Sequence, residues 1–306
     1  MGDIDRSAGT APITTESLYV SAPDGLRLHV KAHRPESVAG LPVVCLPGLA
    51  RTEVDFEALA QHLASDSKHP RQVFALDYRG RGLSSHDPDW QNYNLATELT
   101  DVVTVLTTLG IQQAIFVGTS RGGLLTMLLA ASHASFIAGA VLNDIGPVIE
   151  PNGLMRIKGY IGRMPPPSDY AEGAETLRHI FGAQFPALSY DDWLAWSKRN
   201  WTQTANGMAP RYDPNLGNTL NDVSPDQPVP DLWEAFDALA PAPLMILRGE
   251  LSDLLSPQTV TAMLKRRPDM DVVVVLDQGH APLLAEKPIL TRIEDFCRRC
   301  DTTPKP

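Results

Sequence analysis

The chain has 306 residues, of which 43% are hydrophobic and 20% are charged, a composition typical of a globular protein with a sizeable core. Its 26 basic and 36 acidic residues give a formal net charge of −10, which argues against nucleic acid or an anionic membrane as a partner. No run of about 18 apolar residues is present, so no membrane span is predicted.

The first elements differ in pattern from those that follow. Residues 1–14 are expected to form a disordered tail. Residues 17–35 alternate apolar and polar side chains around a Pro-Asp-Gly turn, which predicts an antiparallel hairpin. Continuous apolar runs then predict buried strands at 41–48, 72–80, 113–118, 137–144, 242–250 and 271–279. Helical patterns lie between them, at 53–65, 95–109, 121–133, 256–267 and 284–300.

This alternation of strands and helices predicts an α/β fold, a mostly parallel doubly wound sheet with right-handed crossovers. One connection, residues 147–230, is too long for a crossover and is rich in aromatic, proline and polar residues. We expect it to form three or four short helices that make a lid, inserted after the sixth main strand. The core then comprises residues 15–146 and 231–300, followed by a C-terminal tail at 301–306.

Residues 114–131 read "AIFVGTSRGGLLTMLLAA" and contain the pattern Gly-x-Ser-x-Gly centred on Ser120, between a predicted strand and a predicted helix. A strand that turns abruptly into a helix strains the backbone of the serine, and the positions two before and two after it are crowded, so only glycine fits there. Such a turn exposes the hydroxyl beside the free N–H groups of a helix start. The pattern therefore predicts a nucleophile at Ser120.

A serine hydroxyl needs a base, and the base needs a group that orients it. His280 follows the last predicted strand on a Gly-His-Ala-Pro turn, unlike the other histidines. Asp253 follows the preceding strand in "RGELSDLLSP" and precedes a capped helix start. The chain order Ser120, Asp253, His280 is that of one known arrangement of the Ser-His-Asp triad.

These motifs resemble the α/β-hydrolase fold family over roughly residues 17–300. The segment "LDYRGRGLSS" at 76–85 is similar to the family's D-x-R-G-x-G-x-S segment. The resemblance implies a serine esterase- or lactonase-like member with a helical cap. Some members take their acid from the end of the sixth strand, where this chain has Asp144; we favour Asp253 and expect Asp144 to order the start of the lid.

The resemblance also implies an oxyanion hole built from two backbone N–H groups, those of Arg121 and Leu49. The loop here reads Pro47-Gly48-Leu49 where the family usually has His-Gly-x. The side chains of Arg51 and Arg121 flank this region, and one of them, with Arg51 favoured, is a candidate for binding a polar or anionic part of the substrate, unless both face solvent or pair with an acidic neighbour. Lid residues that could line an apolar pocket, or pack on the lid itself, are Trp193, Trp196, Phe181 and Tyr160.

The expected activity is hydrolysis of carboxylic esters or lactones through an acyl-enzyme, with a broad preference for small to medium apolar substrates. A serine at position 120 excludes the aspartate-dependent dehalogenases and epoxide hydrolases of this fold. Carbon–carbon bond hydrolases, cofactor-free oxygenases and perhydrolases remain as alternatives, as does a non-catalytic ligand receptor.

No residue pattern indicates a cofactor or metal. The partners expected are a small ester or lactone, without nucleic acid or membrane, and a homodimer is left open. Three cysteines point to a reducing, cytoplasmic environment. Cys297 and Cys300 form a CxxC pair without other ligands nearby, which favours an inert role.

Overall fold

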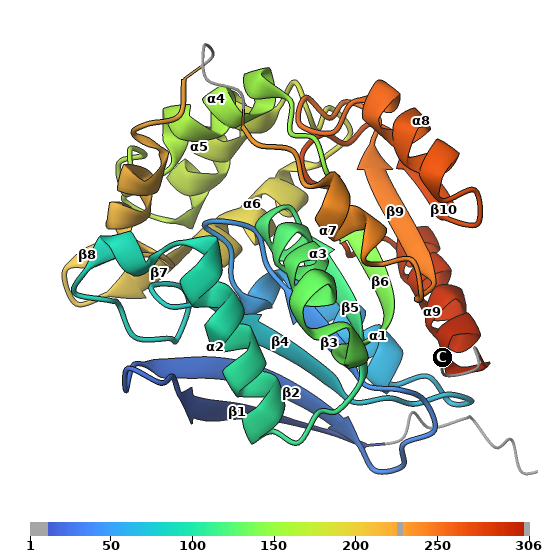
Figure 1. The fold of residues 1–306 in the computed structure, drawn as a ribbon. Coiled ribbons are helices and arrows are strands. Elements are labelled where there is room, and N and C mark those ends of the chain that lie inside the picture. Colours follow the sequence, from blue (N-terminus) through green and yellow to red (C-terminus); the bar gives the residue numbers. More distant parts are fainter. Residues whose placement is uncertain (1–11, 225–228, 303–306) are drawn as a thin grey trace, which may run out of the picture.

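A computed structural model describes residues 12–224 and 229–302 (Figure 1). Its main sheet has eight strands in the order β1-β2-β4-β3-β5-β6-β9-β10. Strand β2 is antiparallel to both of its neighbours, and β4, β3, β5, β6, β9 and β10 pair with one another in parallel. The strands are β1 (Ile13–Ser21), β2 (Arg27–Pro35), β3 (Val43–Leu46), β4 (Val73–Asp77), β5 (Ala114–Thr119), β6 (Ile137–Asn143), β9 (Leu244–Gly249) and β10 (Asp271–Val275).

The helices follow the strands in the crossover pattern that the sequence predicts, and the predicted fold class is confirmed. The α-helices of this core are α1 (Glu57–Ala64), α2 (Leu95–Thr108), α3 (Arg121–His133), α7 (Trp233–Asp237), α8 (Pro257–Arg266) and α9 (Lys287–Thr302). Short 3-10 helices are η1 (Glu53–Phe56), η2 (Trp90–Asn92) and η3 (Ala134–Phe136).

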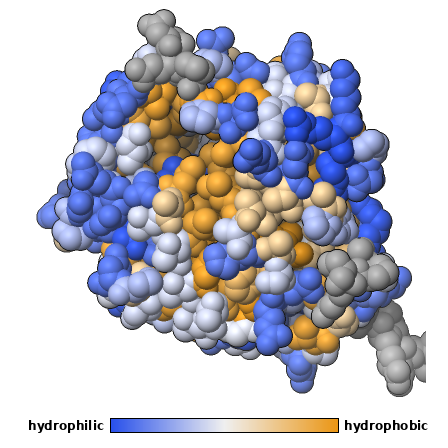
Figure 2. Space-filling view, in the orientation of Figure 1, coloured by the Kyte–Doolittle hydropathy of each residue, from blue (hydrophilic) through white to orange (hydrophobic). Residues whose placement is uncertain are grey.

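Both faces of the sheet are covered, and for this reason its central strands are apolar without alternation. In β5, Ala114 and Phe116 contact the cluster under α2, α3, α7 and α8, whereas Ile115 and Val117 contact the cluster under α1 and α9. All four side chains are fully buried. In the view of Figure 1, α2 and α3 lie in front of the sheet, and apolar side chains gather on this face around α3 and α7 (Figure 2).

The segment between β6 and β9 contains α4 (Pro151–Tyr160), α5 (Tyr170–Phe181), α6 (Tyr190–Asn200), the hairpin of β7 (Trp201–Thr204) and β8 (Gly207–Pro210), and the 3-10 helix η4 (Pro214–Leu220). We call residues 147–230 the inserted segment, of which 225–228 lie outside the described residues. The hairpin was not predicted, because "WTQTANGMAP" is short and carries little alternation.

Several predicted boundaries shift. The predicted tail at 1–14 is wrong at its end, since Ile13 and Thr14 pair with β2; its first eleven residues lie outside the described part of the chain. The predicted tail at 301–306 likewise begins inside α9, and 303–306 lie outside the described residues. In the described residues, no helix combines the length and apolar character that a membrane span requires.

The three cysteines are free and buried in the cluster under α1 and α9. Burial raises the pKa of Cys297 to about 12, so its thiol stays protonated at neutral pH. A buried, protonated thiol is a poor nucleophile and a poor metal ligand. The CxxC pair therefore serves as part of the apolar core.

Candidate active site

Ser120 lies at the sharp turn between β5 and α3, with a φ of 51° and a ψ of −113°. This left-handed backbone is strained for a residue with a side chain. The flanking glycines make the turn possible. A Cβ on Gly118 would lie 2.5 Å from the carbonyl carbon of Gly122, and a Cβ on Gly122 would lie 2.0 Å from the backbone oxygen of Leu46. The crowding expected around Ser120 is present.

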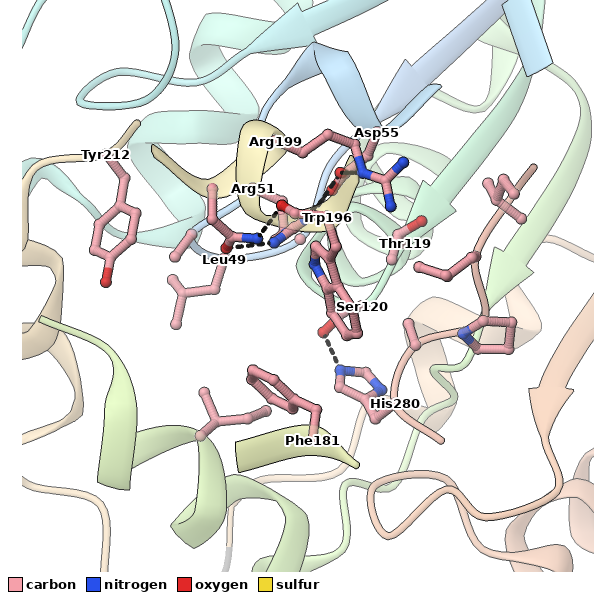
Figure 3. A pocket seen from close by; sticks show the side chains of 18 of the residues that line it. Leu49, Arg51, Asp55, Thr119, Ser120, Phe181, Trp196, Arg199, Tyr212 and His280 are labelled. Carbon is pink, nitrogen blue, oxygen red and sulfur yellow. Dashed lines mark hydrogen bonds and ion pairs between the residues drawn. The ribbon is translucent and has the colours of Figure 1, made fainter. Parts of the chain in front are cut away.

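Ser120 and His280 are in contact, although 160 residues separate them. The Oγ of Ser120 lies 2.9 Å from the Nε2 of His280, and the two side chains meet at the carboxyl ends of β5 and β10 (Figure 3). His280 is 9% exposed, so bulk water has little access to its ring. An imidazole in this position can accept the hydroxyl proton.

The prediction that Asp253 contacts His280 is wrong. The Nδ1 of His280 lies 2.8 Å from the Oδ2 of Asp144, which directly follows β6 and is fully buried. Asp253 instead accepts two hydrogen bonds from Arg156 of α4, at 2.6 and 2.9 Å. Although burial alone would raise it, the Arg156 guanidinium holds the pKa of Asp253 below its usual value. Arg156 of the inserted segment therefore binds the carboxylate that the sequence favours as the triad acid.

The Asp144 carboxylate is fixed on all sides. Its Oδ1 accepts the N–H of Gly249 at 2.8 Å, and its Oδ2 also accepts the hydroxyl of Ser252 at 2.6 Å. The backbone of Asp144 has a φ of 56°, which turns the side chain toward the neighbouring strand β9. With these partners the carboxylate can hold the imidazole in one orientation, with the Nδ1 protonated.

Of the two residues whose backbone N–H groups are predicted to form an oxyanion hole, Leu49 lines the cavity at Ser120 and Arg121 follows Ser120 in the chain. A Cβ on Gly48, which precedes Leu49, would be 3.8 Å from the Cβ of Ser120. Arg121 is the first residue of α3. Within the described parts of the chain, neither N–H has a hydrogen-bond acceptor. Both are therefore free to stabilise an oxyanion.

The Arg121 side chain does not face the cavity. It pairs with the fully buried Glu98 at 2.5 Å and donates to the carbonyl of Tyr93. Glu98 also pairs with the buried Arg81 at 2.7 Å. The Arg121 side chain, one of the two candidates for substrate binding, is thus held inside the core by Glu98 and Tyr93.

A cavity of about 110 Å³ opens at Ser120 and His280, between the core and the inserted segment. Three of the four predicted lid residues line it: Tyr160, Phe181 and Trp196. Trp193 follows the alternative of packing within the lid: it is 2% exposed and stacks on Trp196, with ring centroids 5.3 Å apart. Further lining residues from the inserted segment that the sequence analysis missed are Ile157, Ile161, Met164, Arg199, Asn200 and Tyr212.

Arg51 lines the cavity, but its donors are bound within the protein. Its Nε and Nη2 each lie 2.6 Å from Asp55, and its Nη1 lies 2.7 Å from the Oδ1 of Asn200 (Figure 3). The alternative of pairing with an acidic neighbour therefore holds for this residue. Arg199 and Asn200 follow Trp196 at three and four residues on α6, so helical spacing could have placed them on the same face.

One group of the described residues could bring three ligand atoms to a cation: His29, Glu53 and Asp77. The oxygens of Asp77 already accept the His29 ring at 2.8 Å and the N–H groups of Glu53 and Leu83. The other ring nitrogen of His29 lies 2.9 Å from the hydroxyl of Ser17. This network fits a structural role at the end of β4 better than metal binding.

Glu53 is expected to destabilise the fold at alkaline pH. Burial and the adjacent Asp77 raise the pKa of Glu53 to about 7, from an ordinary value of 4.5. The protonated Glu53 therefore makes its full contribution to stability below pH 4.5, and this contribution is lost as the pH rises through 7. One unit of pKa difference is about 1.4 kcal/mol, so the loss reaches about 3 kcal/mol.

We expect Glu53→Gln to raise the free energy of unfolding by about 1–3 kcal/mol more at pH 8 than at pH 5, measured by urea denaturation. Glutamine keeps the shape of the protonated carboxyl and removes its charge. A gain that is the same at both pH values would contradict the assigned cause.

Comparison with known proteins agrees with this architecture. Residues 42–287 match the family described as alpha/beta hydrolase fold. A 3-hydroxybutyrate-oligomer hydrolase of Cupriavidus necator is 32% identical over 251 residues, which are 80% of this chain and 84% of that protein. An N-formylmaleamate deformylase of Pseudomonas putida is 24% identical over 84% of this chain and 87% of its own length.

Among solved structures, an alpha/beta hydrolase from Novosphingobium aromaticivorans superposes with a TM-score of 0.86 at 39% identity. The match covers 93% of this chain and 98% of that one. On the family match, the sheet order and these relatives, the chain is a hydrolase that belongs to the alpha/beta hydrolase fold family.

Proposed function

We propose that the protein hydrolyses carboxylic esters, with Ser120 as nucleophile, His280 as general base and acid, and Asp144 as the orienting carboxylate. The observation that carries the proposal is the chain of contacts from the Ser120 hydroxyl through His280 to Asp144, at 2.9 and 2.8 Å. This order of groups is the one that makes a serine hydroxyl nucleophilic.

In the first half of the reaction, the Ser120 Oγ attacks the ester carbonyl while its proton passes to the Nε2 of His280. The carbonyl oxygen becomes an oxyanion, which the N–H groups of Leu49 and Arg121 stabilise. His280 then gives its proton to the leaving alcohol, and an acyl-enzyme remains on Ser120. A water molecule, deprotonated by His280, attacks the acyl-enzyme, and His280 returns this proton to the Ser120 oxygen as the acid is released.

The cavity indicates the class of ester. Its walls are largely apolar, with Phe181 and Trp196 from the inserted segment facing Leu49 across the site (Figure 3). Apolar pockets discriminate by only about 1–3 kcal/mol per methylene, so several short acyl chains should be accepted. The relative from Cupriavidus necator acts on 3-hydroxybutyrate oligomers, which supports short hydroxy-acid oligomers as substrates. Lactones of similar size fit the same chemistry.

The test uses a fluorophosphonate probe, p-nitrophenyl esters of two to eight carbons, and a linear trimer of 3-hydroxybutyrate. We expect the wild type to be labelled and to hydrolyse these esters, with the highest kcat/KM on short chains. Ser120→Ala should abolish labelling and lower kcat by at least about 10⁴-fold.

Ser132→Ala is the matched control, because Ser132 lies on the same helix α3 and is exposed, and its hydroxyl contacts only the carbonyl of Leu128 and the ring of the exposed His133. It should keep both labelling and turnover. Labelling that survives in Ser120→Ala would contradict the proposed nucleophile. Labelling without turnover of any ester would favour another reaction of this fold, such as cleavage of a carbon–carbon bond.

A further inference from the structure

The cavity at Ser120 has a charged end. Arg51 and Asp55 come from the loop after β3 and from η1, and Arg199 and Asn200 come from the last turn of α6. Helix α6 is fixed at its start by a capping box between Ser189 and Asp192. The two guanidinium groups are therefore held at the cavity by separate, anchored elements.

The single carboxylate at this end is already used by Arg51. Both oxygens of Asp55 accept hydrogen bonds from Arg51 at 2.6 Å, in the bidentate geometry that carboxylates prefer with arginine. The remaining nitrogen of Arg51 donates to Asn200. Although burial opposes it, Asp55 raises the pKa of Arg51 above its ordinary value. This pair is electrically balanced.

Arg199 is the surplus cation. Its Nε is 3.6 Å from the same oxygen of Asp55 that Arg51 binds at 2.6 Å, and this Nε is buried without a hydrogen-bond partner. Burial and repulsion from Arg51 lower the pKa of Arg199, against the attraction of Asp55. The next carboxylate that acts on Arg199, that of Asp192, is bonded to the backbone and hydroxyl of Ser189. Two cations thus share one anion at this end of the cavity.

The position of this cation relative to Ser120 suggests what it binds. In Figure 3, Arg199, Arg51 and Asp55 lie above the Trp196 ring, Ser120 is seen at the lower part of the ring, and His280 lies below it. A substrate whose ester carbonyl sits at Ser120 would run along an apolar wall and end at a guanidinium with free donors. A carboxylate is the group that such donors bind most strongly.

We propose that Arg199 binds a free carboxylate of the substrate, so that the preferred substrates are short esters that carry a carboxylate at one end. This inference rests on the proposed ester hydrolysis. A carboxylate at Arg199 balances the charge of the cluster and gives the buried Nε an acceptor. Uncharged esters of the same length leave the cation uncompensated and bind more weakly.

The experiment compares substrates that differ only in this charge. One pair is the linear 3-hydroxybutyrate trimer and its methyl ester, with the carboxylate on the alcohol side of the scissile bond. The other is p-nitrophenyl hydrogen succinate and its methyl ester, with the carboxylate on the acyl side. We expect the wild type to prefer the acid in one pair, by a ratio of kcat/KM of about ten or more.

Arg199→Gln should lower that ratio by about ten- to a hundredfold, mainly through KM, and Arg199→Lys should restore part of it. Arg178→Gln is the matched control, since Arg178 is an exposed arginine of the same segment that pairs with Glu175. It should leave the ratio as in the wild type.

Wild-type and Arg199→Gln proteins that show the same ratio in both pairs would overturn the inference. If both proteins still hydrolyse the methyl esters in a Ser120-dependent way, the proposed function stands without it. If the wild type hydrolyses none of these esters, the proposed function itself is wrong. The two failures are therefore distinguishable.

Discussion

Asp144→Asn is expected to lower kcat by about 10⁴-fold, whereas Asp253→Asn is expected to lower it by less than about tenfold. The Oδ1 of Asp144 accepts the N–H of Gly249, and this bond fixes the orientation of an amide placed there. An asparagine that keeps the bond presents its NH₂ group to the Nδ1 of His280.

That amide reverses the protonation of the ring. With a donor facing it, the Nδ1 of His280 becomes the acceptor, and the proton moves to the Nε2, which faces the Ser120 hydroxyl. A protonated Nε2 cannot take the serine proton, so the loss falls on kcat. Asp253 pairs with Arg156 instead, and a partly exposed ion pair of this kind contributes about 1 kcal/mol or less to stability.

The measurement is single-turnover kinetics on a p-nitrophenyl ester for both variants, with thermal unfolding as the check on folding. Equal losses in both variants would show that the two carboxylates act together. A larger loss in Asp253→Asn would restore Asp253 as the acid and require the inserted segment to release it during turnover.

The difficulty of choosing between these acids from the sequence has a physical reason. Asp144 and Asp253 follow β6 and β9, which are neighbours in the sheet, so both reach the same edge. The pattern of strands and turns locates both carboxylates, and the resemblance to the family favours Asp253, which the structure places elsewhere. The choice is made by Arg156 of α4, more than 90 residues away from Asp253, and by the left-handed backbone of Asp144. Neither feature has a local signature in the sequence.

The nucleophile and its histidine could be located because their requirements are local. The glycines around Ser120 are dictated by atoms within a few residues or on the adjacent strand, and His280 follows its strand directly. The cavity wall depends on how the inserted segment packs. Its aromatic residues could be recognised as a group, yet Trp193 faces inward and Arg199 faces the cavity, which only the rotation of α6 decides.

Gly122→Ala is expected to reduce stability by about 3–5 kcal/mol, and the melting temperature by about 10 °C, and to remove most of the activity of the remaining folded protein. A Cβ at this position would be 2.0 Å from the backbone oxygen of Leu46 and 2.8 Å from its Cβ. Backbone atoms of a central strand cannot turn aside as a side chain can. Leu46 is paired with Gly118 in β5, so β3 would have to move away from the strand that carries Ser120.

Gly159→Ala is the matched control for this change. Gly159 lies within α4, and a Cβ there would meet nothing within 4 Å. Since alanine is the better helix former, this variant should gain up to about 1 kcal/mol. Thermal unfolding of the two variants separates the general effect of a methyl group from its effect at the turn.

The activity of Gly122→Ala tests a second consequence of the same contact. Leu46 is followed directly by the loop that contains Gly48 and the proposed oxyanion donor Leu49. Any shift of β3 that admits the methyl group also moves that donor, and a lost oxyanion donor costs about 2.7–4 kcal/mol of barrier. A folded Gly122→Ala protein should therefore still react slowly with fluorophosphonate but turn over esters about 10²–10³-fold less. If the destabilised variant keeps the wild-type kcat, the strain at β3 does not affect turnover through the following loop. Leu49 is then removed from the proposed mechanism.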